Sequence, residues 1–238
     1  MSNLFGRLLV VLVLLTALSG LLAWFKLGHV VAQPSWITSD MQNRYFYGSV
    51  GTTDSTGLPY WMWLAMPRIF PEHMPGPGGY AALGLSWEEG REMPIGFAKQ
   101  RMGYIRVTGN CALCHVISRS TGQDQAPAIV PVVDGQTTGI QPLLMFYKQC
   151  AHDPRFNADE FFAEINSDTR LSFSDKLLYR YVLIPRMKRA LIDDPAKVLF
   201  STELRAHARD PKSGEPLSAP EMNEVENWMR DQSRTAKQ

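Results

Sequence analysis

Five consecutive residues, Cys111-Ala112-Leu113-Cys114-His115, decide the interpretation of the whole sequence. They form the pattern C-x-x-C-H, which places two thiols and an imidazole within about one helical turn. Cysteines at this spacing can each form a thioether with a vinyl group on one edge of a porphyrin, and the imidazole then faces the iron. The motif therefore predicts one covalent haem c, attached through Cys111 and Cys114, with His115 as the proximal ligand of the iron.

Other uses of a C-x-x-C pair find less support in the sequence. A structural zinc site would need a second Cys/His pair at ligand spacing, and the sequence contains none. A thioredoxin-like redox pair would need a βαβ pattern, which is also missing. The third cysteine, Cys150, falls on the apolar face of a predicted helix, so we expect a buried structural residue.

The sequence leaves the second axial position of the iron open. Its candidate ligands are two histidines and two methionines: Met145, His152, Met187 and His207. We favour His207 among them, because it lies shortly before the predicted last helix, a region that often supplies the distal ligand in small c-type cytochromes. An open or water-bound position is the alternative, and it would permit chemistry on oxygen or peroxide.

The N-terminal segment 8–25, LLVVLVLLTALSGLLAWF, contains 18 residues without a charge. As a helix it would span about 27 Å, close to the thickness of a hydrocarbon core. We expect a transmembrane anchor, with a signal peptide cleaved near Ala32 as the alternative. Either reading predicts export, so the haem domain is expected on the periplasmic side of a single-pass inner-membrane protein. The expected division is an anchor over 1–32, a linker and lead-in over 33–58, and a haem domain over 59–238.

Composition excludes several classes of protein. Lysine plus arginine is 24 and aspartate plus glutamate is 23, giving a net charge of +1, which argues against a nucleic-acid binder. A hydrophobic fraction of 45% argues against general disorder, and three cysteines are too few for a disulfide scaffold. The mean hydropathy of −0.15 excludes a polytopic membrane protein.

The pattern beyond the motif is mostly helical. Residues 59–96 are rich in proline and glycine and carry large aromatic residues, among them Trp61, Trp63, Phe70, Tyr80 and Trp87. Packing on the protein's own helices and contact with a flat apolar ligand are two compatible readings of these residues. Helical periodicity follows over residues 141–151, 158–165, 171–192, 196–208 and 218–233. The expected fold class is therefore mostly α: a cytochrome c-like haem domain with long ordered loops, preceded by one transmembrane helix.

The run GLPYWMWLAMPRIFPEHMPGPGGYAALGLSWEEGREMPIGFAKQRMGYIRVTGNCALCH, and the later CAHDPRFNADEFFAEI and LLYRYVLIPRMKRALI, carry a family resemblance. Over roughly residues 45–192 the chain resembles the first-haem half of large exported c-type cytochromes that include rubber oxygenases and are related to dihaem cytochrome c peroxidases. The resemblance implies that Cys111 and Cys114 bind haem, that His115 is its axial ligand, and that the fold is mostly α. The family's second C-x-x-C-H has no counterpart here, so we expect one haem.

These observations predict a membrane-anchored mono-haem c-type cytochrome that carries electrons between redox partner proteins, expected to be membrane oxidoreductases. The alternative is a haem-dependent oxygenase or peroxidase with an open distal site. A gas sensor or an accessory subunit of a larger complex is a third possibility. An electron carrier is favoured over an enzyme, because a dihaem enzyme uses its second haem to store or relay an electron.

Overall fold

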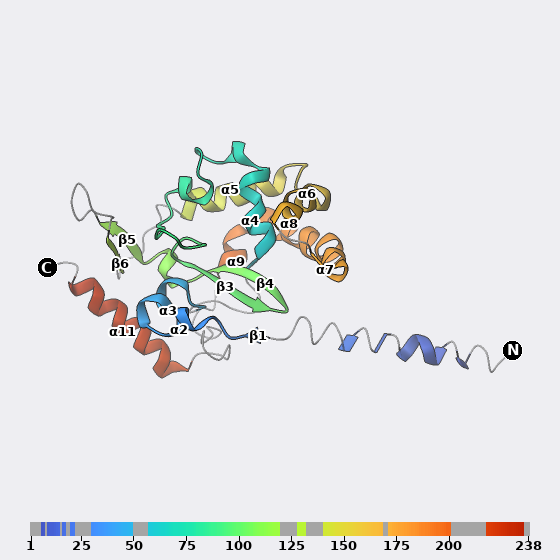
Figure 1. The fold of residues 1–238 in the computed structure, drawn as a ribbon, viewed down its shortest axis with the longest axis horizontal. Coiled ribbons are helices and arrows are strands. Elements are labelled where there is room, and N and C mark those ends of the chain that lie inside the picture. The colour runs from blue at the N-terminus through green and yellow to red at the C-terminus, as the bar shows by residue number, and fades with distance from the viewer. Residues whose placement is uncertain are drawn as a thin grey trace.

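Figure 1 shows the computed structural model of the chain. The structure describes residues 30–49, 57–119, 128–131, 140–168, 171–200 and 218–235, together with the pieces 6–7, 9–14, 16–17 and 20–21. Its helices are α2 (Ser35–Thr38), α3 (Met41–Tyr47), α4 (Tyr60–Ile69), α5 (Ile140–His152), α6 (Ala158–Asp168), α7 (Phe173–Leu178), α8 (Ile184–Asp193), α9 (Pro195–Leu199) and α11 (Ala219–Thr235). Shorter helical turns are η1 (Pro71–His73), η2 (Gly79–Leu83), η3 (Cys111–Leu113) and the π-helical turn η4 (Tyr179–Leu183).

A β-hairpin lies between two groups of helices. β3 (Phe97–Met102) pairs antiparallel with β4 (Tyr104–Gly109), and the chain reverses at Gly103, whose φ of +77° favours glycine. The short strands β1 (Val30–Val31) and β2 (Leu58–Pro59) extend the sheet to the order β1-β3-β4-β2. In Figure 1, α4 to α9 lie on one side of this hairpin, and α2, α3 and α11 lie on the other.

A second, two-stranded sheet follows the C-x-x-C-H motif directly. β5 (Val116–Arg119) pairs antiparallel with β6 (Ala128–Pro131), with Val116 opposite Pro131. The helix α11 packs against β6. The motif therefore lies between two antiparallel hairpins, since β4 ends at Gly109 and β5 begins at Val116.

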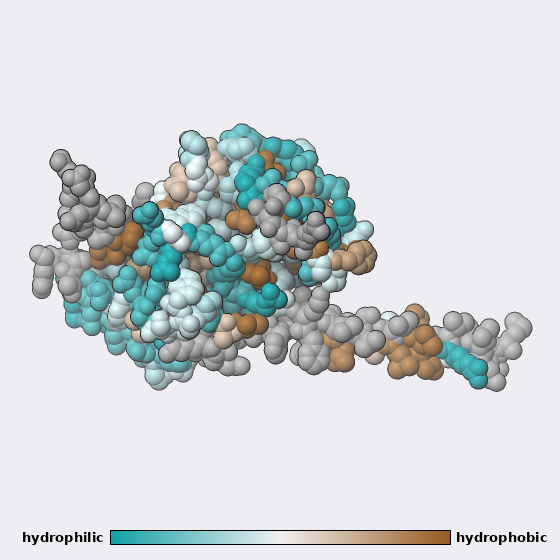
Figure 2. All heavy atoms as spheres, in the orientation of Figure 1, coloured by the Kyte–Doolittle hydropathy of each residue, from teal (hydrophilic) through white to brown (hydrophobic). Residues whose placement is uncertain are grey.

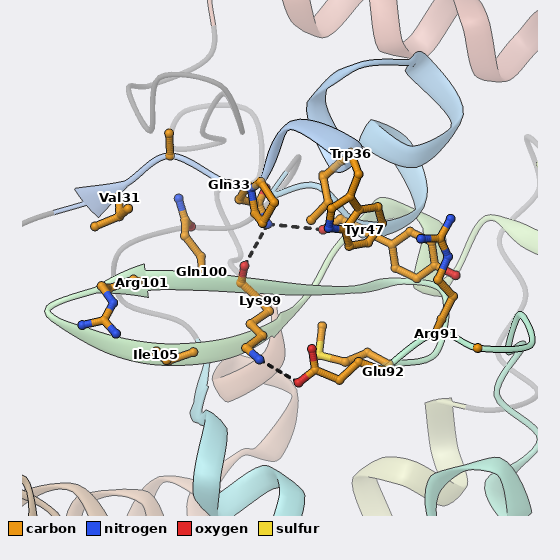
Figure 3. A pocket seen from close by; sticks show the side chains of 15 residues that line it. Val31, Gln33, Trp36, Tyr47, Arg91, Glu92, Lys99, Gln100, Arg101 and Ile105 are labelled. Atoms are coloured by element: carbon orange, nitrogen blue, oxygen red, sulfur yellow. Dashed lines mark hydrogen bonds and ion pairs between the residues drawn. The ribbon is translucent and has the colours of Figure 1, made fainter. Parts of the chain in front are cut away.

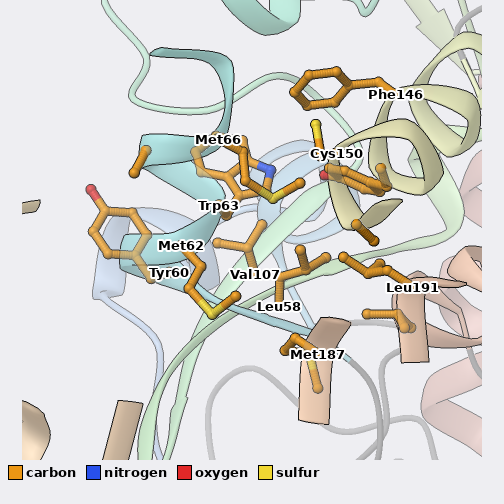
Figure 4. Close-up of a cluster of buried hydrophobic side chains, with 14 of the residues drawn as sticks. Leu58, Tyr60, Met62, Trp63, Met66, Val107, Phe146, Cys150, Met187 and Leu191 are labelled. Carbon is orange, nitrogen blue, oxygen red and sulfur yellow. The ribbon is translucent and has the colours of Figure 1, made fainter. Parts of the chain in front are cut away.

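The larger hydrophobic core, which we call the main core, packs α4, α5, α6 and α8 with the β4 side of the sheet (Figure 4). Trp63 of α4 stacks on Tyr80, with ring centroids 4.5 Å apart and an interplanar angle of 7°. The Tyr80 hydroxyl donates a hydrogen bond of 2.8 Å to the carbonyl of Trp63. Six aromatic residues of the proline-rich segment belong to this core or pack against it: Tyr60, Trp61, Trp63, Phe70, Tyr80 and Trp87. They pack on the protein's own helices, as the first reading expects, and contact with a ligand stays a prediction.

A smaller apolar cluster surrounds the C-x-x-C-H motif, and we call it the motif cluster. Its buried members are Ile37, Tyr45, Phe46, Tyr47, Ile95, Ala112, Val116 and Val225. Met41, Cys111, Ile129, Trp228 and Met229 pack against them while remaining partly exposed. Segments far apart in sequence thus meet at the motif: α2 and α3, the turn before β3, η3, the second sheet and α11. The visible face of the folded part is otherwise mostly hydrophilic (Figure 2).

Local side-chain signals shape three of the helices. Asn157 caps α6, because its Oδ1 accepts hydrogen bonds from the backbone N–H groups of Asp159 and Glu160. Ser218 and Glu221 form capping contacts at the start of α11. Before Pro185 the helix forms a π-helical turn, in which the N–H of Ile184 reaches the carbonyl of Tyr179. Proline lacks an N–H and clashes with the preceding turn, so the ladder shifts there.

The expected fold class is wrong about the N-terminal segment. A transmembrane helix over residues 8–25 would need about 20 consecutive apolar residues in one helix. Among the residues that the structure describes, no helix is both long and apolar enough to cross a membrane. The mostly helical expectation also missed the central hairpin, because Lys99, Arg101 and Arg106 interrupt its apolar alternation. Residues 33–49, expected as linker, form α2 and α3 and contribute to the motif cluster.

Cys150 is a buried residue of the main core, with none of its surface exposed. Burial raises the pKa of its thiol well above the usual range. We predict that Cys150→Ser lowers the free energy of unfolding by about 1–3 kcal/mol, because a hydroxyl replaces sulfur among apolar neighbours. Urea denaturation measures the change, with Cys150→Ala as the control for lost volume. A loss below about 0.5 kcal/mol would contradict the packing role.

Candidate functional site

The C-x-x-C-H motif folds as a single 3₁₀ turn, η3, between two strands. The backbone N–H groups of Cys114 and His115 donate to the carbonyl of Cys111 at 3.3 and 3.2 Å. Because a 3₁₀ helix has three residues per turn, positions i and i+3 lie one above the other. Cys111 and Cys114 therefore share one side of the turn. Both are free thiols with part of their surface exposed.

Asn110 fixes the start of this turn. Its Oδ1 accepts a hydrogen bond of 2.9 Å from the backbone N–H of Ala112. Its Nδ2 lies within hydrogen-bond distance of three carbonyls at the end of α3, those of Tyr45, Phe46 and Gly48, at 3.2, 3.2 and 2.9 Å. Asn110 is 2% exposed, so these contacts replace water around its amide. The turn is thus attached to α3 by the protein's own polar groups.

Gly96 allows the chain to pass directly behind the motif. Its φ is +89°, and a Cβ at this position would lie 2.3 Å from the Cα of Leu113. Its N–H donates to the carbonyl of Phe46 at 3.0 Å, and its own carbonyl accepts from the N–H of Asn110 at 2.8 Å. Glycine is required both by the conformation and by the close approach. The backbone of the motif is therefore supported from α3, from residue 96 and from β4.

Tyr45 connects the motif to α11. Its hydroxyl lies 3.3 Å from the carbonyl oxygen of His115 and 3.2 Å from the sulfur of Met229. Its ring packs against Trp228, with centroids 5.2 Å apart. Burial raises the pKa of Tyr45 far above its usual value, so the hydroxyl stays protonated and remains a donor. Tyr45 of α3 therefore contacts both the main chain of His115 and Met229 of α11.

The pKa values of the two motif thiols are both raised by burial. Burial, followed by the proximity of Cys114, raises the pKa of Cys111 to about 11. Burial also raises the pKa of Cys114. Thiol–disulfide exchange and zinc binding both use the thiolate, which low-pKa cysteines supply. The environment of this pair therefore does not favour a redox-exchange motif.

Three of the four expected distal ligands lie away from the motif cluster. Met145 is 59% exposed on α5, and Met187 is 7% exposed inside the main core. His152 is exposed at the end of α5, where its Nδ1 lies 2.8 Å from the carbonyl of Lys148. None of these three belongs to the cluster around the motif. The fourth candidate, His207, lies outside the described residues.

The structure adds residues that sequence reasoning missed. Asn110 and Gly96 support the turn, and Tyr45, Met41 and Met229 surround it. Met229 belongs to the apolar face of the last helix that the periodicity had indicated, but the sequence alone does not show which surface that face meets. Asn110 immediately precedes the motif, and an asparagine there is a recognisable N-cap signal. The contacts of Gly96 and Tyr45 depend on residues far away in the chain.

A second cluster of chemistry-bearing side chains lies beside the main core. Ligand atoms of Glu72, His73 and Asp153 lie within 4.8 Å of one another. The Arg155 guanidinium contacts both carboxylates, at 2.7 Å from Asp153, and the His73 ring stacks on Phe70. A cation already compensates these carboxylates, so the arrangement does not fit a metal site.

The motif residues fit a covalently attached haem. Two free thiols lie on one side of a supported turn, and the imidazole of His115 follows them directly. Apolar and aromatic side chains of the motif cluster adjoin the turn, as a large flat apolar group requires. Comparisons with models of protein families, with curated proteins and with solved structures found no match. The resemblance to rubber-oxygenase-like cytochromes stays a prediction.

Gly96→Ala tests the support of the motif turn. Gly84 has a similar φ of +80°, but a Cβ added there would have nothing within 4 Å, so Gly84→Ala is a matched control for conformational strain alone. We expect Gly84→Ala to cost about 1–2 kcal/mol of unfolding free energy. Gly96→Ala should cost at least about 2 kcal/mol more, because its Cβ meets the backbone of Leu113. Equal losses in the two variants, measured by urea denaturation, would contradict the close approach.

Proposed function

We propose that this chain is a mono-haem c-type cytochrome that transfers electrons on the periplasmic side. Cys111 and Cys114 would hold one haem c through thioethers, and His115 would ligate its iron. The observation that carries the proposal is the supported 3₁₀ turn, which presents two free thiols on one side with the histidine next in sequence. A bound haem would supply a one-electron redox couple.

The chain's own residues would position and shield such a group. Asn110 and Gly96 fix the turn that carries the thiols, so the attachment points are set by the protein backbone. Tyr45 holds the carbonyl of His115 and thereby limits movement of that residue. The motif cluster excludes water on the side of η3, and burial of this kind tunes the reduction potential of a haem.

Redox partner proteins, including membrane oxidoreductases, are the partners that this function implies. The mostly hydrophilic face seen in Figure 2 is compatible with transient encounters between soluble surfaces. Periplasmic placement follows from the chemistry of the motif, because haem c is attached to C-x-x-C-H after export.

One observation supports a second candidate function. Among the described residues, none of the expected distal ligands adjoins the motif, since Met145, His152 and Met187 lie elsewhere. An open sixth position would suit a haem-dependent oxygenase or peroxidase. The motif cluster does contain two thioether sulfurs, those of Met41 and Met229.

Replacing Cys111 and Cys114 by alanine tests the attachment. We expect the double variant to lose all haem that survives denaturation, because both thioethers are removed. Haem staining of a denaturing gel measures this, with Cys150→Ala as the matched control that keeps its covalent haem. Covalent haem persisting in the double variant would show that the thiols of the motif are not the attachment points.

Carbon monoxide distinguishes the two functions. An electron carrier with both axial positions filled should give sharp low-spin bands after dithionite reduction, unchanged by the gas. A high-spin spectrum that shifts with carbon monoxide would instead show an open site and favour the oxygenase or peroxidase. The measurement needs only the purified holoprotein and a visible spectrometer.

A further inference from the structure

The cavity of about 410 Å³ beside β1 does not bring complementary groups together (Figure 3). Trp36 and Arg101 lie at opposite ends of its lining, and the Arg101 guanidinium points away from the tryptophan. The Arg91 guanidinium already lies over the Trp36 ring, 4.5 Å from its centroid. By contrast, exposed apolar and cationic side chains lie close together on the outer side of α7, η4 and α8.

The residues from Phe173 to Asp193 form one continuous helical segment, made of α7, η4 and α8. Its inner side belongs to the main core, through Tyr179, Leu183, Ile184, Met187 and Leu191. In Figure 1, α7 lies at the opposite end of the folded part from α11. The segment is therefore remote from the motif cluster, to which α11 contributes.

The outer side of this segment begins with exposed apolar side chains, which we call the apolar row: Phe173, Leu177, Tyr181 and Val182. Residues at i, i+4 and i+8 share a helix face, so Phe173, Leu177 and Tyr181 project in one direction. Phe173 is 78% exposed and Tyr181 is 70% exposed, the two largest values for large apolar side chains in the described part of the chain. A helix that only covers a core carries polar side chains on this face, so the apolar row indicates a further contact.

Cations accompany the apolar row. Between residues 176 and 192 the sequence has no aspartate or glutamate and five basic residues: Lys176, Arg180, Arg186, Lys188 and Arg189. Arg180 pairs with Asp159 of α6 at 2.6 Å. Arg186 and Arg189 are exposed, and neither forms an ion pair with a residue that the structure describes. The outer side of the segment is thus positive as well as apolar.

We propose that the outer side of α7, η4 and α8 lies on the surface of an anionic lipid bilayer. Aromatic and aliphatic side chains insert at the boundary between headgroups and acyl chains, while lysine and arginine attract anionic lipids. A protein partner would bury each projecting anchor in a matching pocket, whereas a fluid bilayer accepts such side chains without one. The contact uses residues other than the apolar segment 8–25 and does not depend on haem.

Photolabelling of the full-length holoprotein from within the bilayer tests this contact. The vesicles contain phosphatidylglycerol and phosphatidylcholine, with a tracer phosphatidylcholine that carries a diazirine in its acyl chain. Mass spectrometry locates the label in the digested protein. We expect label in the peptides that cover residues 171–189, at least about fivefold more than with pure phosphatidylcholine vesicles. Because the labelled position is identified directly, contact through residues 8–25 is recognised separately.

Substitutions in the apolar row should remove this label. Phe173→Ser combined with Tyr181→Ser should lower it by at least about fivefold, because the two most exposed apolar side chains are lost. Both side chains are exposed, so the fold is expected to be retained. Met145→Ser is the matched control, since Met145 is exposed on α5 outside the apolar row, and it should leave the label unchanged.

Arg189→Gln should lower the label in anionic vesicles by at least about threefold, because it removes an exposed charge near the bilayer surface. Lys148→Gln removes an exposed cation of α5 instead and should have no effect. Label confined to residues 8–25, equal label with the two kinds of vesicle, or equal losses in the double serine variant and in Met145→Ser would each overturn the proposal. Absence of label at residues 171–189 would also overturn it, and is the result expected if an acidic protein surface is the partner instead.

Discussion

The side chain of Asn110 joins the C-x-x-C-H turn to the end of α3, and the arrangement of the site depends on it. Its amide uses both ends, accepting from the N–H of Ala112 and approaching three α3 carbonyls through Nδ2. The last carbonyls of a helix lack partners within the helix. Asn110 supplies donors to this helix end and caps its own turn, so one residue satisfies two sets of backbone groups. α3 and η3 therefore behave as one structural unit.

The apolar residues divide between two clusters that differ in size and exposure. The main core contains the large buried aromatic side chains and joins α4, α5, α6 and α8. The motif cluster is smaller, and five of its members remain partly exposed. Close packing makes a filled core intolerant of an additional large group. A flat cofactor is accommodated more easily beside the smaller cluster, which is where the two cysteines lie.

Local signals in the sequence located α5, α6 and α11 but not α2, α3 and α4. The period of the apolar residues over 141–151 predicts α5 within one residue at each end, and Asn157 caps α6. The central hairpin was missed because cations occupy positions at which an alternating strand would carry apolar residues. Lys99 lies over the Tyr60 ring and contacts Glu92, so a tertiary partner makes a charge acceptable there.

Five residues of the sequence were sufficient to predict the chemistry of the site. The residues that support the motif turn could not all be predicted in this way. C-x-x-C-H needs only local spacing, and Asn110 lies next to it. The approach of Gly96 to Leu113 requires knowing that two segments meet, which no local pattern reports. Met145 and Met187 were plausible ligands by type alone, but their positions place them elsewhere.

The contact between Tyr45 and Met229 spans 184 residues of sequence. Among the described residues, the main core draws on none beyond Phe200, whereas the motif cluster is incomplete until α11 has been synthesised. Closing a loop of this length costs conformational entropy, and contacts between distant segments form slowly. In a nascent chain, the side of the motif cluster that α11 covers therefore stays open until that helix has been made. If haem is attached to these cysteines, as we propose, the attachment would take place on a turn that α3 and Gly96 already support.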